Sequence, residues 1–140
     1  MFVMLAGCGE KGDPVADLAA KTVTLPDGTK ITAELKLDAA SQATGMMYRD
    51  SLAKNRGMLF YNIAPSLQPY WMHNCKIPLD IVWLDPAKKV VEIAVNAQPC
   101  QKPPKECPTY GGHRMSQYVL ELNAGEAKRH GVAIGRILPF

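Results

Sequence analysis

The side chains best suited to chemistry in this chain gather in residues 71–85, WMHNCKIPLDIVWLD. Met72, His73 and Cys75 offer a thioether, an imidazole and a thiol, which are soft ligands of the kind that hold Cu(I). A cysteine near a histidine can also act as an activated nucleophile. Both tryptophans of the chain and the carboxylate of Asp80 lie in the same stretch. The stretch therefore predicts either a binding or reactive site, or a structural pin around Asp80.

Residues 79–84 have the pattern of a strand that is buried on both faces, because neither set of alternating side chains is mainly polar. Asp80 shares one face with Val82 and Leu84, and a carboxylate in that position is costly unless it is paired. Arg49 is the candidate partner, since its planar guanidinium group matches a carboxylate. The pair could be an internal salt bridge that joins a helix-loop segment to the sheet.

The alternative is a small-ligand cleft that includes the same pair, with an aromatic side chain as a stacking platform for the ligand. In that interpretation the platform is Trp71, and the candidate ligand-binding residues are Arg49, Trp71, Asn74 and Asp80.

A Cu(I) site built from Met72, His73 and Cys75 is a weaker hypothesis. Neighbouring strand residues face opposite sides, and methionines more often fill a core. A thiol enzyme would use Cys75 as nucleophile with His73 or His113 as base, and the two-residue spacing of His73 and Cys75 permits contact on one face. The sequence shows no nucleophile elbow, phosphate-binding glycine loop or zinc-protease helix motif. We therefore assign no catalytic residue and expect no cofactor.

The other cysteines have separate predicted roles. Cys100 and Cys107 flank residues 101–106, QKPPKE, which the prolines keep out of a helix interior. A disulfide that closes so short a loop stabilises the fold by about 2–3 kcal/mol in the chain-entropy model. A structural zinc site would need a second matching pair, and the chain offers none. A Cys100–Cys107 disulfide is the favoured prediction, which leaves Cys75 as a buried residue or a free thiol.

The N-terminal residues Leu5-Ala6-Gly7-Cys8 resemble the lipobox of bacterial lipoproteins, in which the cysteine is lipidated. Residues 1–8 would then be the remnant of a lipoprotein signal, and residues 9–21 a flexible tether. Residues 1–4 are too short for a signal peptide, so we expect a late start or a fragment. A lipidated Cys8 would place the domain in the bacterial cell envelope, where disulfides persist.

Size and composition narrow the function classes. The 140 residues are enough for one domain with a substantial core. The net charge of +3 is small and scattered, which argues against a nucleic-acid partner. No run approaches the roughly 18 apolar residues that a membrane-spanning helix needs.

The predicted elements are mostly strands joined by hairpins. An Asp-Gly turn joins strands at 22–25 and 30–37, and Asp38 is a plausible N-cap for a helix over 39–44. Further strands are expected at 57–61, 70–72, 79–84, 90–95 and 118–122. Asn123 is expected to cap a second helix over 124–130, which Gly131 ends. These elements predict a mainly β single domain with two short helices, folded as a compact antiparallel sandwich or barrel.

The long loop over 96–117 holds a Tyr-Gly-Gly-His-Arg segment at 110–114. Its glycines predict mobility, and its tyrosine, histidine and arginine are good contact residues for a partner protein. A merely solvated loop is the favoured interpretation of this segment.

Several motifs in one order resemble the DUF192 family, also called UPF0127. They are TGMMYRDSL at 44–52, GMLF at 57–60, WMHN at 71–74, IPLDI at 77–81, the Pro-Cys and Cys-Pro pairs at 99–100 and 107–108, and YVLELNAG at 118–125. The resemblance runs from about residue 21 to the C-terminus. It implies a β-rich, jelly-roll-like domain that is often exported and has no established activity. This chain has His73 and Cys75 where the family usually has a basic residue and a threonine, so chemistry at these positions would be its own.

Together these patterns predict a lipid-anchored, envelope-facing, non-catalytic binding or accessory module. Its expected partners are the membrane, through the lipid on Cys8, and an unknown small ligand or envelope protein. The alternative is a thiol-dependent envelope enzyme or a Cu(I)-binding protein. Only the alternative should fail when Cys75 is replaced by threonine.

Overall fold

Eight strands and two short α-helices form residues 19–140, the part of the chain that the computed structural model describes. Their bounds are β1 Ala20–Thr24, β2 Lys30–Lys36, α1 Ala39–Thr44, β3 Arg56–Leu67, β4 Tyr70–Trp71, β5 Leu79–Leu84, β6 Val90–Ala97, β7 Thr109–Tyr110, β8 Met115–Asn123 and α2 Glu126–Arg129. A 3-10 turn, η1, spans Pro104–Glu106. The predicted mainly β domain with two short helices is confirmed. The predicted lipidation site, Cys8, and most of the predicted tether lie outside the described residues.

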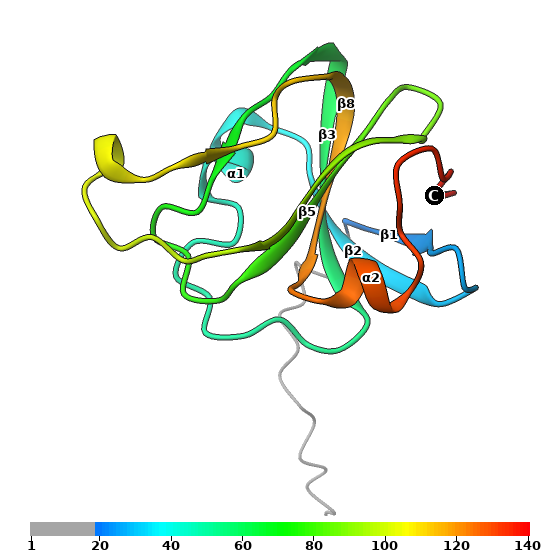
Figure 1. The fold of residues 1–140 in the computed structure, drawn as a ribbon, viewed down its shortest axis with the longest axis horizontal. Helices are drawn as coiled ribbons and strands as arrows, with labels where there is room; N and C mark the ends of the chain where they lie inside the picture. The colour runs from blue at the N-terminus through cyan, green and yellow to red at the C-terminus, as the bar shows by residue number, and fades with distance from the viewer. Residues whose placement is uncertain (1–18) are drawn as a thin grey trace, which may run out of the picture.

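Six of the strands form one sheet in the order β1-β2-β3-β8-β5-β6, and β4 pairs with β7 in a second, two-stranded sheet (Figure 1). All pairs in both sheets are antiparallel except β2 and β3, which run parallel. A parallel pair needs a crossover connection, and residues 37–55 with α1 provide it. The expectation of antiparallel pairing throughout is therefore wrong at this one place.

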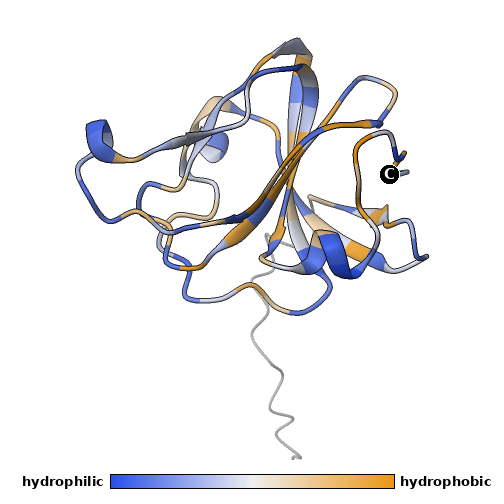
Figure 2. Cartoon of the chain, viewed as in Figure 1, coloured by the Kyte–Doolittle hydropathy of each residue, from blue (hydrophilic) through white to orange (hydrophobic). Residues whose placement is uncertain are grey.

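The large sheet separates two apolar cores. Strand β5 is buried along its whole length, as predicted. Leu79, Ile81 and Trp83 belong to one core, whereas Val82 and Leu84 belong to the other. Figure 1 shows α1 and α2 on opposite sides of β3, β5 and β8, so each core has one helix beside it. In Figure 2 the central strands carry most of the hydrophobic colour, while α2 and η1 are largely hydrophilic.

The local signals around the first helix are confirmed. The side chain of Asp38 accepts a hydrogen bond from the backbone N–H of Ser41 at 2.9 Å, and Gly45 is the C-cap. The second helix begins later than predicted, with Gly125 rather than Asn123 as its N-cap. Asn123 stays in β8, where it pairs with Leu79 of β5, because sheet pairing outweighs its capping preference. Neither α-helix within residues 19–140 has the length and apolar character needed to cross a membrane.

Strand β3 continues well past the predicted end at residue 61. Its pairing with β8 shifts register between Tyr61 and Ser66, and Pro65 lies inside that irregular stretch. A proline removes a ladder hydrogen bond, and a bulge lets the strand continue beyond it. Because β3 continues to Leu67, Gln68 and Pro69 are the two residues that connect it to β4.

Candidate functional site

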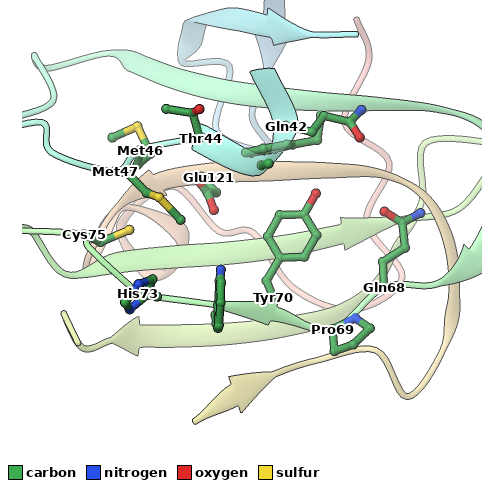
Figure 3. Close-up of a pocket in the computed structure, with 14 residues that line it drawn as sticks. Gln42, Thr44, Met46, Met47, Gln68, Pro69, Tyr70, His73, Cys75 and Glu121 are labelled. Atoms are coloured by element: carbon green, nitrogen blue, oxygen red, sulfur yellow. The ribbon is translucent and has the colours of Figure 1, made fainter. Parts of the chain in front are cut away.

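A cavity of about 330 Å³ lies between the α1 segment and β4, with the central strand β8 at its floor (Figure 3). Three parts of the chain line it: α1 with the residues after it, β4 with its flanks, and single residues of β3 and β8. The lining residues are Gln42, Ala43, Thr44, Gly45, Met46, Met47, Phe60, Gln68, Pro69, Tyr70, Trp71, His73, Cys75 and Glu121.

Glu121 is the buried carboxyl group of this cavity. It lies in β8 opposite Met58 of β3 and Ile81 of β5, and it is 4 % exposed. Its Oε2 atom has no hydrogen-bond partner in the described part of the chain. Burial raises the pKa of Glu121 to about 8, against the opposing effect of the Arg49 charge. Glu121 is therefore mainly protonated at neutral pH.

The same strand carries an apolar residue on each side of Glu121, and the alternation sends Glu121 to the face of Val119. In Figure 3 the Glu121 carboxyl group and the sulfur atoms of Met47 and Cys75 point into the space between α1 and β4. The site thus combines one ionisable group with soft and aromatic neighbours.

Aromatic side chains form much of the cavity wall. The rings of Phe60 and Tyr70 meet edge to face at 5.1 Å, and Tyr70 also meets Trp83 at 5.9 Å. Trp71 is 39 % exposed, and its ring lies 4.9 Å from that of His73. Burial raises the pKa of the Tyr70 hydroxyl far above its ordinary value, and the charge on Glu121 adds to this shift. Tyr70 is therefore a neutral hydroxyl at any physiological pH.

The basic groups beside the cavity already have a partner outside it. Arg49 contacts Glu34 through two nitrogen atoms, at 2.8 and 3.1 Å. Lys36 contacts the same carboxylate at 2.6 Å. Neither Arg49 nor Lys36 lines the cavity, so its interior holds no Lys or Arg side chain.

The predicted pairing of Arg49 with Asp80 is wrong. Asp80 is fully buried and accepts hydrogen bonds from the backbone N–H groups of Asn96 at 2.8 Å, Gly125 at 3.0 Å and Ala127 at 3.0 Å. These groups lie at the end of β6 and the start of α2, on the face that Asp80 shares with Val82 and Leu84. Asp80 is therefore a structural pin, held by backbone amides rather than by a guanidinium group.

Of the four residues predicted to form a ligand cleft, only Trp71 lines the cavity. Arg49 lies beside the cavity with Glu34, and Asp80 lies on the opposite face of the sheet. Asn74 has a left-handed backbone with φ 59°, and its side chain donates to the Tyr48 hydroxyl at 2.9 Å. The cavity is therefore lined by Glu121 and not by Asp80.

The three soft ligands do not converge on one point. Met72 is 1 % exposed and packs in the core beside α1. Nδ1 of His73 lies 3.7 Å from Sγ of Cys107, so the imidazole faces the disulfide. No group of three or more His, Cys, Asp or Glu side chains within residues 19–140 is placed to hold a metal ion.

Cys75 is buried, and its environment opposes formation of a thiolate. Burial, with a smaller contribution from the charge on Glu121, raises the pKa of its thiol to about 12. Only the thiolate is a strong nucleophile, so this environment does not favour a thiol enzyme.

The predicted disulfide between Cys100 and Cys107 is present, with Cα atoms 5.8 Å apart. It is tied to the rim of the cavity through the segment after β4. The backbone N–H of Asn74 donates to the carbonyl of Cys100 at 3.0 Å, and the N–H of Cys100 donates to the carbonyl of Met72 at 3.1 Å. The closed loop therefore supports the backbone on which His73 and Cys75 lie.

The Gly-Gly segment after β7 is packed rather than free, which corrects the predicted mobility. A Cβ atom on Gly111 would lie 2.2 Å from the Trp83 ring, and one on Gly112 would lie 2.6 Å from the backbone of Pro69. Nδ1 of His113 lies 2.5 Å from a carboxylate oxygen of Glu92, and the backbone N–H of His113 donates to the same carboxylate at 3.0 Å. These glycines let the β7 segment cover Trp83 closely.

Glu121 is the functional candidate that the sequence reasoning missed. The sequence carries the same signal for Glu121 as for Asp80, namely a carboxylate inside a strand of otherwise apolar residues. Residues 118–122 show that pattern, with Leu120 and Leu122 on either side of Glu121.

Comparison with known proteins places the chain in an uncharacterised group. The family model DUF192, described as "Uncharacterized ACR, COG1430", matches residues 22–140. A protein of unknown function from Novosphingobium aromaticivorans DSM 12444 is similar in structure, with a TM-score of 0.72, 30% identity, and coverage of 86% of this chain and 85% of that one. A candidate transcription regulator from Sinorhizobium meliloti 1021 has a TM-score of 0.76, 32% identity, and coverage of 86% and 93%. No curated protein matches significantly.

Proposed function

This chain belongs to the DUF192 family, and from that premise we propose that it is a non-catalytic binding module whose cavity over Glu121 takes a small organic ligand. The observation that carries the proposal is a buried carboxyl group that lines a cavity and has an unpartnered oxygen atom within residues 19–140. Leaving such an atom unpaired costs about 1–3 kcal/mol, and the proposed ligand would offset this cost by pairing with the carboxyl group.

The proposed location is the bacterial cell envelope, with the membrane reached through a lipid on Cys8. Two observations support this. The sequence Leu5-Ala6-Gly7-Cys8 resembles a lipobox, and the Cys100–Cys107 disulfide suits an oxidising compartment. Besides the membrane and the small ligand, an envelope protein is the proposed kind of partner.

We do not extend the description of the Sinorhizobium meliloti protein to this chain. Common DNA-binding motifs place a helix of several turns in the major groove. The two α-helices of the described residues have six and four residues, and the net charge of the chain is +3. These features favour a small ligand over nucleic acid.

The binding proposal is tested by blocking the cavity. Thr44 is exposed and lines the cavity, whereas Ala40 is exposed on the same helix and does not line it. A small-molecule library is screened by thermal shift and native mass spectrometry on the wild-type chain, Thr44→Trp and Ala40→Trp. We expect ligands that bind the wild type and Ala40→Trp but lose at least tenfold in affinity for Thr44→Trp. Ligands that bind all three proteins equally, or no ligand at all, would contradict the proposal.

The anchor is tested separately, on protein produced from its own gene in its native host. We expect mass spectrometry of the membrane fraction to find an acylated Cys8, and Cys8→Ser to move the protein out of that fraction. A Cys8 thiol without lipid in the membrane-bound protein would show that the anchor proposal is wrong.

A further inference from the structure

The charge of the cavity lining points to the class of ligand. Among the lining residues, Glu121 is the one carboxyl group, and none is Lys or Arg. His73 also lines the cavity, and its Nδ1 faces the sulfur of Cys107. An ionised Glu121 would therefore leave a buried negative charge that no Lys or Arg among the lining residues neutralises.

The two amide side chains that line the cavity are engaged elsewhere. Gln42 donates its amide hydrogens to the carbonyls of Lys36 and Tyr61, at 3.1 and 2.9 Å. Gln68 donates to the carbonyl of Ser116 at 3.0 Å. Because these amides are occupied, the Glu121 carboxyl group is the strongest hydrogen-bonding group that the cavity offers to a ligand.

The other buried carboxylate of the sheet, Asp80, is fully hydrogen-bonded to the backbone and has a structural role. Asp80, one strand away in the same sheet, receives three backbone hydrogen bonds. Glu121 faces the cavity with Oε2 unpartnered in the described part of the chain. Ser116 Oγ is also buried without a partner there, but Ser116 does not line the cavity. The unpartnered carboxyl oxygen and the cavity thus coincide at Glu121 alone.

The remaining walls suit a positive charge that carries carbon substituents. Phe60, Tyr70 and Trp71 present aromatic rings, and Met46 and Met47 present polarisable thioethers. A cation over an aromatic face gains about 0.5–2 kcal/mol, and aromatic cages recognise quaternary ammonium groups in this way. The volume of about 330 Å³ is at the lower end for ligand sites, which favours a ligand of few heavy atoms.

We propose that this cavity binds a small organic cation of the amine or quaternary ammonium class, with the Glu121 carboxylate as its counter-ion and the rings of Tyr70 and Trp71 against its substituents. The inference rests on the proposed binding function and names the ligand class of the same site.

Proton balance gives the inference a measurable signature. At neutral pH the carboxyl group is protonated, so binding of a cation releases one proton to solvent and leaves the carboxylate paired with the ligand. The pKa of Glu121 is raised to about 8 by burial, with Arg49 opposing. The thiol of Cys75 and the hydroxyl of Tyr70 also face this carboxyl group. Burial raises the pKa of each of these two groups well above that of Glu121, so both stay neutral below pH 8. Affinity for a permanent cation therefore rises with pH up to about 8 and is level above it.

The test compares cations with neutral molecules of the same shape. Isothermal titration calorimetry on the full chain carrying Cys8→Ser uses choline against 3,3-dimethyl-1-butanol, and n-butylamine against n-butanol. We expect at least one cation to bind at least tenfold more tightly than its neutral counterpart at pH 8.5. For choline we expect about tenfold or more weaker binding at pH 6.5, with proton release that varies with the ionisation enthalpy of the buffer.

Variants then locate the charge. Glu121→Gln should abolish both the preference for cations and the pH dependence. Glu106→Gln, which removes an exposed carboxylate that does not line the cavity, should change neither. Trp71→Ala should weaken choline binding several-fold, while Trp71→Phe should restore part of it.

Two failures are distinguishable. If neutral and cationic probes bind the cavity equally, and Glu121→Gln has no effect, the ligand class is wrong but the binding function stands. If no cation binds the wild type better than its neutral counterpart, and the library screen with Thr44→Trp also finds no ligand, both proposals are overturned. The pH dependence of the wild type decides the question even if Glu121→Gln does not fold.

Discussion

At the scale of single residues, two buried carboxyl groups in neighbouring strands have opposite environments. Asp80 lies in β5 and receives three backbone N–H groups, so its charge is satisfied by the fold itself. Glu121 lies in β8 on the other face, where Oε2 has no partner within residues 19–140. Asp80 therefore contributes to stability, whereas the unpaired oxygen atom of Glu121 is the observation on which the binding proposal rests.

Asp80 and Arg49 should act independently. Asp80→Asn places an amide group against backbone donors and should lower the free energy of unfolding by about 2–3 kcal/mol. Arg49→Ala loses a partly exposed ion pair and should cost about 1 kcal/mol or less. The two effects should add to within about 0.5 kcal/mol in the double variant, because the residues share no partner. Urea unfolding measures all three, and a coupling energy well above that margin would show an interaction that the contacts do not contain.

The burial of Asp80 was predicted from the sequence, but its partners and the burial of Glu121 were not. The period-2 pattern correctly placed Asp80 beside Val82 and Leu84. It could not show that backbone amides from β6 and α2 would reach Asp80, since those segments are distant in sequence. For the same reason, the sequence did not show that Arg49, in the crossover between β2 and β3, pairs with Glu34 of β2 instead of Asp80.

At the scale of elements, close packing of β7 against the large sheet holds one side of the cavity. The Gly111 backbone lies directly on the Trp83 ring, and the indole N–H of Trp83 donates to the carbonyl of Gln68 at 2.8 Å. Tyr70 and Trp71 of β4 pair with Tyr110 and Thr109 of β7. The two short strands therefore depend on an aromatic side chain of β5 for their position.

Gly111→Ala should disrupt this arrangement. The new Cβ atom would lie 2.2 Å from the Trp83 ring, at a backbone φ of 66°. We expect a loss of about 3 kcal/mol or more in the free energy of unfolding, from the clash and the backbone strain together. Gly28→Ala is the matched control, because Gly28 has a φ of 87° and no neighbouring atom within 4 Å. The control should cost only about 1 kcal/mol. Equal losses in urea unfolding for the two variants would mean that the ring contact is unimportant.

Elements with strong local signals were predicted well, and those defined by long-range pairing were not. The Asp-Gly hairpin, the Asp38 cap and strand β5 each follow from a few adjacent residues. The parallel β2–β3 pair depends on a crossover that contains a helix of six residues. The extension of β3 past Pro65 depends on a register shift against β8, which no local pattern shows.

At the scale of the whole molecule, the pKa of Glu121 links folding to pH. The group has an ordinary pKa of 4.5 and a folded pKa of about 8. Below about 4.5 it is protonated in both states, so folding carries no penalty. Between these values only the unfolded chain releases the proton, and folded stability falls as pH rises. Above about 8 the loss is complete.

Glu121→Gln should therefore stabilise the protein at pH 8.5 and have little effect at pH 4.5. The melting temperature of the variant should exceed that of the wild type by about 5 °C or more at the higher pH. Differential scanning calorimetry at both values measures the change. His130, whose pKa is raised by its bond to Asp27, also loses stabilising interactions as pH rises, but its effect is common to both proteins. A constant difference between wild type and variant across this range would contradict the assignment of Glu121.

The floor of the cavity belongs to the large sheet, whereas its rim belongs to short elements, so substitutions at the two places differ in their cost to stability. Its floor is a central strand of a six-stranded sheet, whose buried side chains pack into one or the other of the two apolar cores. Its rim is formed by a helix of six residues and a strand of two residues, and a disulfide-closed loop supports the segment after that strand. Substitutions at exposed rim positions such as Thr44 and Trp71 can therefore accumulate at small cost in stability. Under the proposed binding function, such substitutions would change the ligand preference of the rim and leave the buried carboxyl group in place.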